Sequence, residues 1–192
     1  MTREDWLTKY IDDYGRELFK RAGHKLPKTR VSVGLPFGRG SKKAIGQHWH
    51  PKASDDGVSQ VFISPTIVDG VEVLATLIHE LVHACEPDAK HGKKFRLCAE
   101  AVGLTGQMKA TVPGPELTAE LEKNIKKIGK YPHAKLNLGM RPTKKQTTRM
   151  VKMECPVCEY KARAALTKIL EVGPVICPCN NEPMQVTLPE ET

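Results

Sequence analysis

Aromatic residues are scarce in this chain, and it has no long uninterrupted apolar run. Phe, Trp and Tyr together make up 5% of the 192 residues, which leaves few rings for stacking against nucleic-acid bases. A bilayer span needs about 20 predominantly apolar residues, so we expect no membrane segment and no membrane partner. The most apolar stretch, residues 71–85, is interrupted by polar side chains at Glu72, Thr76, His79, Glu80 and His83.

The first residues also lack the pattern of a secretory signal peptide. Glu4 and Asp5 stand where a signal peptide carries basic residues followed by an apolar segment. We therefore expect a cytoplasmic protein, which DNA binding would place at the nucleoid.

The apolar share, 40% of the residues, is too high for a wholly disordered chain. Together with the length, it predicts one folded domain with a small appendage. We expect an α+β domain over residues 1–128, a basic linker over 129–149 and a small β domain over 150–192.

Positive charge is concentrated in the C-terminal third of the chain. The 30 Lys and Arg exceed the 22 Asp and Glu, which gives a net charge of +8 at pH 7. Residues 129–168 contain ten basic and two acidic side chains, a surplus equal to the whole net charge. Such a segment attracts polyanions and predicts binding to DNA phosphates without sequence preference. A solvated, lysine-rich linker is the alternative interpretation.

Local patterns predict four helices and three strands in the first domain. Apolar residues recur at helical spacing, and Gly or Pro ends the pattern, in residues 2–23, 69–86, 92–102 and 115–128. Stretches rich in β-branched residues, separated by Gly, Pro and Ser clusters, are residues 30–34, 43–49 and 59–64. We expect a small antiparallel sheet with the helices packed on it.

The helix expected over residues 69–86 contains His79-Glu80-Leu81-Val82-His83. Residues four apart on a helix face the same side, so both imidazoles can bind one metal ion. Glu80 lies beside them and can act as the general base towards a water molecule on the metal. Two unpaired imidazoles and a carboxylate are costly to bury in a mostly apolar helix, which favours catalytic zinc over a structural histidine pair.

A hydrolytic zinc site needs a third protein ligand and one open position for water. The turn after Pro87 lets the chain fold back, so His91 is our predicted third ligand. Glu100 is the main alternative because it lies on the returning helix, and Glu86 and Asp88 are the other candidates.

Four of the six cysteines form two close pairs, Cys155 with Cys158 and Cys177 with Cys179, with 18 residues between the pairs. In a chain without a signal peptide this spacing predicts one structural zinc ion held by four thiolates. Reactive or merely buried thiols are the alternative. The second pair has a single intervening residue, so we expect its loop to be distorted.

His48 and His50 lie on one face of a predicted strand, with Trp49 on the other. We interpret this segment as an ordinary strand. The alternative is an edge strand that faces substrate beside the catalytic cleft.

These features together resemble the SprT-like (Spartan-type) metalloprotease family. The resemblance rests on the helix around residues 77–84, the segment His91-Gly92-Lys93-Lys94-Phe95, the preceding sheet and the C-terminal cysteine pairs, and it covers residues 6–102 and 150–184. It implies a zincin-like minimal protease domain followed by a zinc ribbon. It also implies zinc binding by His79, His83 and His91, a base at Glu80, and activity on proteins bound or crosslinked to DNA.

Composition and spacing alone indicate only a zinc hydrolase, so two other functions stay open. One is a DNA-binding or transcription-associated zinc protein whose histidine site is silent or binds a partner. The other is a metal-dependent hydrolase of small amides.

Overall fold

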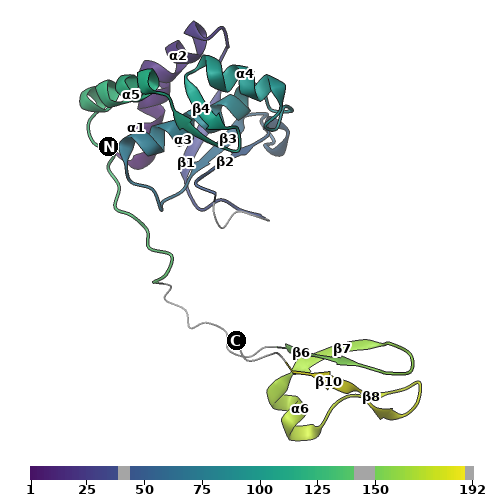
Figure 1. Cartoon of the computed structure of the whole chain (residues 1–192). Coiled ribbons are helices and arrows are strands. Elements are labelled where there is room, and N and C mark those ends of the chain that lie inside the picture. Colours follow the sequence, from purple (N-terminus) through teal and green to yellow (C-terminus); the bar gives the residue numbers. More distant parts are fainter. Residues whose placement is uncertain (39–43, 141–149, 189–192) are drawn as a thin grey trace. The chain divides into compact units, whose positions relative to one another are not determined.

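The computed structural model describes residues 1–38, 44–140 and 150–188, which form two compact units, Met1–Gly139 and Met140–Thr192 (Figure 1). The first unit combines helices with a small sheet, and the second contains short strands and one helix. The predicted α+β class is thus confirmed. Within the described residues, no helix is both long and apolar enough to cross a membrane.

The N-terminal helical segment runs through α1 (Arg3–Tyr10), the π-helical turn η1 (Ile11–Gly15) and α2 (Arg16–Arg21). Thr2 and Asp5 cap its start reciprocally, each side chain accepting a hydrogen bond from the other's backbone N–H. Trp6 is fully buried and donates its indole N–H to the carbonyl oxygen of Gly129 at 2.8 Å. This segment therefore joins the beginning of the first unit to its end.

The sheet of the first unit contains β1 (Thr29–Val33), β2 (Gly46–Trp49) and β3 (Ser59–Ile63) in the order β1-β3-β2. Strands β2 and β3 are antiparallel, but β1 runs parallel to β3, so the predicted wholly antiparallel sheet is wrong. Strand β3 lies between β1 and β2, although it follows both of them in the sequence. Residue patterns predict which segments are strands and carry no information on the direction of a neighbour.

The central helix is α3 (Gly70–Cys85), which starts at Asp69, whose side chain accepts a hydrogen bond from the backbone N–H of Glu72. It packs on the sheet and is followed by α4 (Lys93–Ala101) and α5 (Pro115–Ile128), as predicted. Between α4 and α5 lies a hairpin that the sequence did not predict, made of β4 (Leu104–Gln107) and β5 (Ala110–Pro113).

The first unit extends beyond the domain boundary expected at residue 128. Tyr131 is buried against Trp6, with ring centroids 5.0 Å apart. His133 and the backbone N–H of Leu136 both hydrogen-bond the carbonyl oxygen of Pro65, each at 2.8 Å. A single buried aromatic ring and hydrogen bonds to a backbone carbonyl produce no periodic pattern in the sequence, so the boundary could not be predicted from it. Residues 141–149 of the expected linker lie outside the described residues.

The second unit has a three-stranded antiparallel sheet in the order β10-β6-β7, made of β6 (Met150–Glu154), β7 (Lys161–Ala165) and β10 (Gln185–Thr187). Helix α6 (Leu166–Val172) follows β7, and a second pair consists of β8 (Ile176–Cys177) and β9 (Glu182–Pro183). Among its described residues, the buried core cluster consists of Met153, Cys155, Cys177 and Met184, with four partly buried apolar residues packed against it. A core this small needs a further source of stability, such as a bound metal ion.

Candidate metal centres

Three histidines of the first unit converge on one point. His79 and His83 lie one turn apart on α3, and the Nε2 atom of His91 lies 3.4 Å from Nε2 of His79 and 3.2 Å from Nε2 of His83. A tetrahedral zinc ion with Zn–N bonds of about 2.0 to 2.1 Å requires nitrogens about 3.3 Å apart. Both measured distances match two corners of a zinc tetrahedron, and the ligand nitrogens of all three histidines lie within 4.8 Å of one another.

The turn after α3 delivers His91 to this group. Lys90 adopts a left-handed backbone conformation (φ 47°), and Gly92 donates its N–H to the carbonyl oxygen of Ala89 at 2.9 Å, which closes the turn before α4. In the described structure the candidate carboxylates stay outside the histidine group: Asp88 lies 3.5 Å from His50, and Glu86 and Glu100 do not join it either. Among the candidates for third ligand, the fold thus brings His91 to His79 and His83.

Burial tunes the histidines for metal binding. It lowers the pKa of His79 to about 4 and that of His83 to about 3, and it also lowers the pKa of His91. The imidazoles are therefore neutral at pH 7, and each ring has a nitrogen lone pair that can bind a metal cation. Phe95 of α4 is fully buried and packs against all three rings, with centroid distances of 4.4 to 5.0 Å.

Thr111 of β5 orients His79 and is a site residue that the sequence analysis missed. Its Oγ1 lies 2.8 Å from Nδ1 of His79. When the hydroxyl accepts a hydrogen bond from Nδ1–H, the Nε2 lone pair is left for the metal. Thr111 was not predicted because it lies in the unpredicted hairpin, and only the folding of this hairpin brings it to α3.

Thr111→Val should weaken zinc binding by about tenfold or more, since outer-shell partners of metal-binding histidines typically contribute 10- to 100-fold to affinity. Competition with a chromophoric chelator measures the change. Thr105→Val is the matched control, because it removes a hydroxyl from the same hairpin, where Thr105 bonds the carbonyl oxygen of Val112 instead. Equal zinc affinity in the two variants would refute this role of Thr111.

Glu80 is buried next to the histidines, with 6% of its surface exposed. Burial raises its pKa to about 8, although the backbone N–H of His48 donates a hydrogen bond to the carboxylate. Strand β2 lies very close to α3 at Gly46. A Cβ added to this glycine would lie 2.5 Å from Oε1 of Glu80. The absence of a side chain at Gly46 thus allows the strand to hold the carboxylate in place.

The histidines and Glu80 face an open cleft of about 840 Å³ between β2, α3, the turn after α3 and β5. His48 of β2 and His50, which follows the end of that strand, line this cleft. The His48 ring stacks on that of His83 with centroids 6.1 Å apart. Strand β2 is also one of the two edge strands of its sheet. The alternative interpretation of this segment, an edge strand beside the cleft, therefore describes its position; contact with a substrate stays a prediction.

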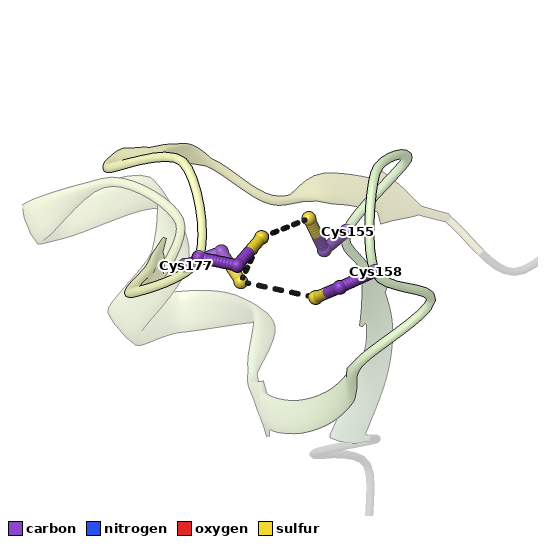
Figure 2. A group of neighbouring side chains, drawn as sticks. Cys155, Cys158 and Cys177 are labelled. Atoms are coloured by element: carbon purple, nitrogen blue, oxygen red, sulfur yellow. Dashed lines mark hydrogen bonds between the residues drawn. The ribbon is translucent and has the colours of Figure 1, made fainter.

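The four paired cysteines of the second unit also gather, as Figure 2 shows for the loop with Cys155 and Cys158 facing Cys177. The Sγ atoms of Cys155 and Cys179 are 3.5 Å apart, and those of Cys158 and Cys177 are 3.6 Å apart. Tetrahedral coordination with Zn–S bonds of about 2.3 Å places the sulfurs about 3.8 Å apart. Four thiolates at nearly this spacing can enclose one metal ion and leave it no open position.

The two cysteine loops close in the same way despite their different spacing. In the first loop, the backbone N–H of Glu159 donates to the carbonyl oxygen of Cys155 at 3.0 Å. In the second loop, the backbone N–H of Asn181 donates to the carbonyl oxygen of Cys177 at 2.8 Å, again across four residues. Both residues have left-handed backbone angles, φ 57° and φ 56°. The second loop thus keeps the turn of the first, contrary to the expected distortion, and only its second cysteine is moved one position earlier.

Hydrogen bonds favour the thiolate of Cys155. The backbone N–H groups of Cys158 and Val157 donate to its sulfur and lower its pKa to about 6. The opposite holds for Cys179, because hydrogen bonds with the neighbouring thiols, that of Cys158 first, raise its pKa.

Comparisons with protein-family models, with curated proteins and with solved structures found no match to this chain.

Proposed function

We propose that this chain is a zinc-dependent metallopeptidase of the SprT-like type, with a zincin-like first unit and a zinc ribbon as its second. The observation that carries this function is the convergence of the ring nitrogens of His79, His83 and His91, within 4.8 Å of one another, beside buried Glu80 in an open cleft. Three nitrogen ligands and one open position form the ligand set of a catalytic zinc ion. Four enclosing thiolates form that of a structural one.

Zinc in such a site supplies a Lewis acid and lowers the pKa of a water molecule from 15.7 to about 7. Glu80 accepts the proton of the attacking water and then passes it to the leaving amine. The backbone N–H of His48 orients the carboxylate, and Thr111 holds the His79 ring. The edge strand β2 supplies the wall along which the substrate lies.

The basic residues of the C-terminal third support action on proteins bound or crosslinked to DNA. On β6 and β7, Lys152 pairs in register with Arg163, and Lys161 with Glu154. Val151 and Met153 alternate with Lys152 and are buried, so Lys152 lies on the other face of the sheet, where Arg163 is exposed. Four further basic residues of the segment 129–168, namely Arg141, Lys144, Lys145 and Arg149, lie outside the described residues.

The function is tested with a protein crosslinked to a DNA oligonucleotide and with the same protein free. Zinc-loaded chain should cleave the crosslinked protein faster, and chelation should stop cleavage until zinc is restored. DNA binding without hydrolysis of any peptide bond would instead favour a zinc protein with a silent histidine site. Hydrolysis confined to small amides would favour the third function.

Replacing Arg141, Lys144, Lys145 and Arg149 together by Gln should make DNA binding weaker and less dependent on salt. Each lost phosphate contact lowers the magnitude of the slope of log affinity against log salt by about 0.7 to 0.9. Fluorescence anisotropy at several salt concentrations measures the slope. The control variant carries the same loss of charge on exposed lysines of the first unit, at Lys20, Lys28, Lys123 and Lys126. Equal slopes in both variants would mean that the basic segment is only a solvated linker.

A further inference from the structure

The wall of the cleft beside His91 is positively charged. Lys90 immediately precedes His91, Lys109 lies in the two-residue turn between β4 and β5, and both lysines line the cleft with exposed side chains. Lys109 and the three histidines line the same cleft.

Both lysines are presented by turns that are anchored in the first unit. Lys90 lies in the left-handed turn that Gly92 closes by its hydrogen bond to Ala89. Met108, next to Lys109, is buried in the main core, and Thr111 of the same hairpin bonds His79. The backbone positions of the two lysines are thus fixed relative to the histidines.

The cleft offers these cations no carboxylate at its surface. In the part of the chain that the structure describes, neither Lys90 nor Lys109 forms an ion pair. Among the described residues that line the cleft, Glu80 is the only acid, and it is buried. Asp88 is nearby in the sequence, but it lies against His50. A negatively charged group of a ligand would therefore neutralise the positive charge of Lys90 and Lys109 on this wall.

We propose that Lys90 and Lys109 form a subsite for an acidic side chain, Asp or Glu, close to the scissile bond of the substrate. This subsite rests on the proposed peptidase function and names its substrate class. A side chain is favoured over a DNA phosphate because the lysines share the cleft with the three histidines. A volume of about 840 Å³ suits an extended peptide segment rather than a duplex.

A set of fluorogenic peptides tests the subsite, with Glu, Gln or Lys placed in turn at each position on both sides of one cleavage point. At one position, Glu should exceed Gln in kcat/KM by about five- to tenfold, which corresponds to an ion-pair contribution of about 1 to 1.4 kcal/mol. The double variant Lys90→Gln with Lys109→Gln should lose this preference. Lys94→Gln, an exposed lysine of α4 that does not line the cleft, should keep it.

Binding of the same peptides to the Glu80→Gln variant, measured by anisotropy, separates the two proposals. Glu-selective binding that needs Lys109, without cleavage of any peptide by the unsubstituted chain, would overturn the peptidase function and leave the subsite. Cleavage without charge preference would overturn the subsite alone, and neither cleavage nor selective binding would overturn both. If the double variant instead loses DNA affinity and keeps its peptide selectivity, the lysines bind phosphate and the subsite is refuted.

Discussion

Glu80→Gln is expected to reduce peptide turnover by about 10²- to 10⁴-fold, the range that a general base contributes. The amide cannot accept the proton of the attacking water. The fold should tolerate it, because Gln has nearly the shape of Glu and burial disfavours the charge of Glu80, which raises its pKa to about 8. Zinc content should also be unchanged, since the assigned ligands are the three histidines.

Steady-state kinetics on one peptide, elemental analysis for zinc and a thermal melt check this prediction together. Glu72→Gln serves as the control, because Glu72 is an exposed acid on the same helix. Full activity of Glu80→Gln would refute the mechanism. A loss of zinc from this variant would show that Glu80 is itself a ligand.

Cys155→Ser should unfold the second unit and remove one of two zinc ions from the chain. The buried core cluster of this unit consists of two methionines and two of the cysteines, so we expect a bound metal ion to supply most of its folding free energy. Structural zinc contributes about 10 to 16 kcal/mol in small zinc-binding peptides. The first unit has its own large core and should keep its zinc ion.

Zinc stoichiometry and amide hydrogen exchange of the two units measure this effect. Val157→Ser is the matched control, because Val157 is 68% exposed between Cys155 and Cys158 and offers no ligand atom. Retention of both zinc ions and of slow exchange in the second unit of Cys155→Ser would show that the cysteines do not hold a structural metal.

The histidine site could be predicted from the sequence where its geometry is local. His79 and His83 are one helical turn apart, and the apolar pattern of α3 identifies their helix directly. His91 requires only the short turn after Pro87. The cysteine pairs are similar, because each lies within one loop. Such patterns depend on neighbours in sequence and are therefore visible before the fold is known.

Contacts between distant segments could not be predicted in this way. The hairpin of β4 and β5 has four-residue strands, and residues 105–107 are exposed, so it lacks the alternation of a half-buried strand. Thr111 and Lys109 were missed with it. The close approach at Gly46 and the parallel pairing of β1 likewise depend on how separate elements pack, which no local pattern records.

The most direct test of the proposed site is an anomalous-scattering map, recorded at the zinc absorption edge from crystals of the full chain. Two peaks are predicted. One should lie about 2.0 to 2.1 Å from Nε2 of His79, His83 and His91, and the other about 2.3 Å from the four Sγ atoms of the cysteines. A map with a peak at the cysteines and none at the histidines, or with Glu100 in place of His91, would contradict the assigned catalytic centre.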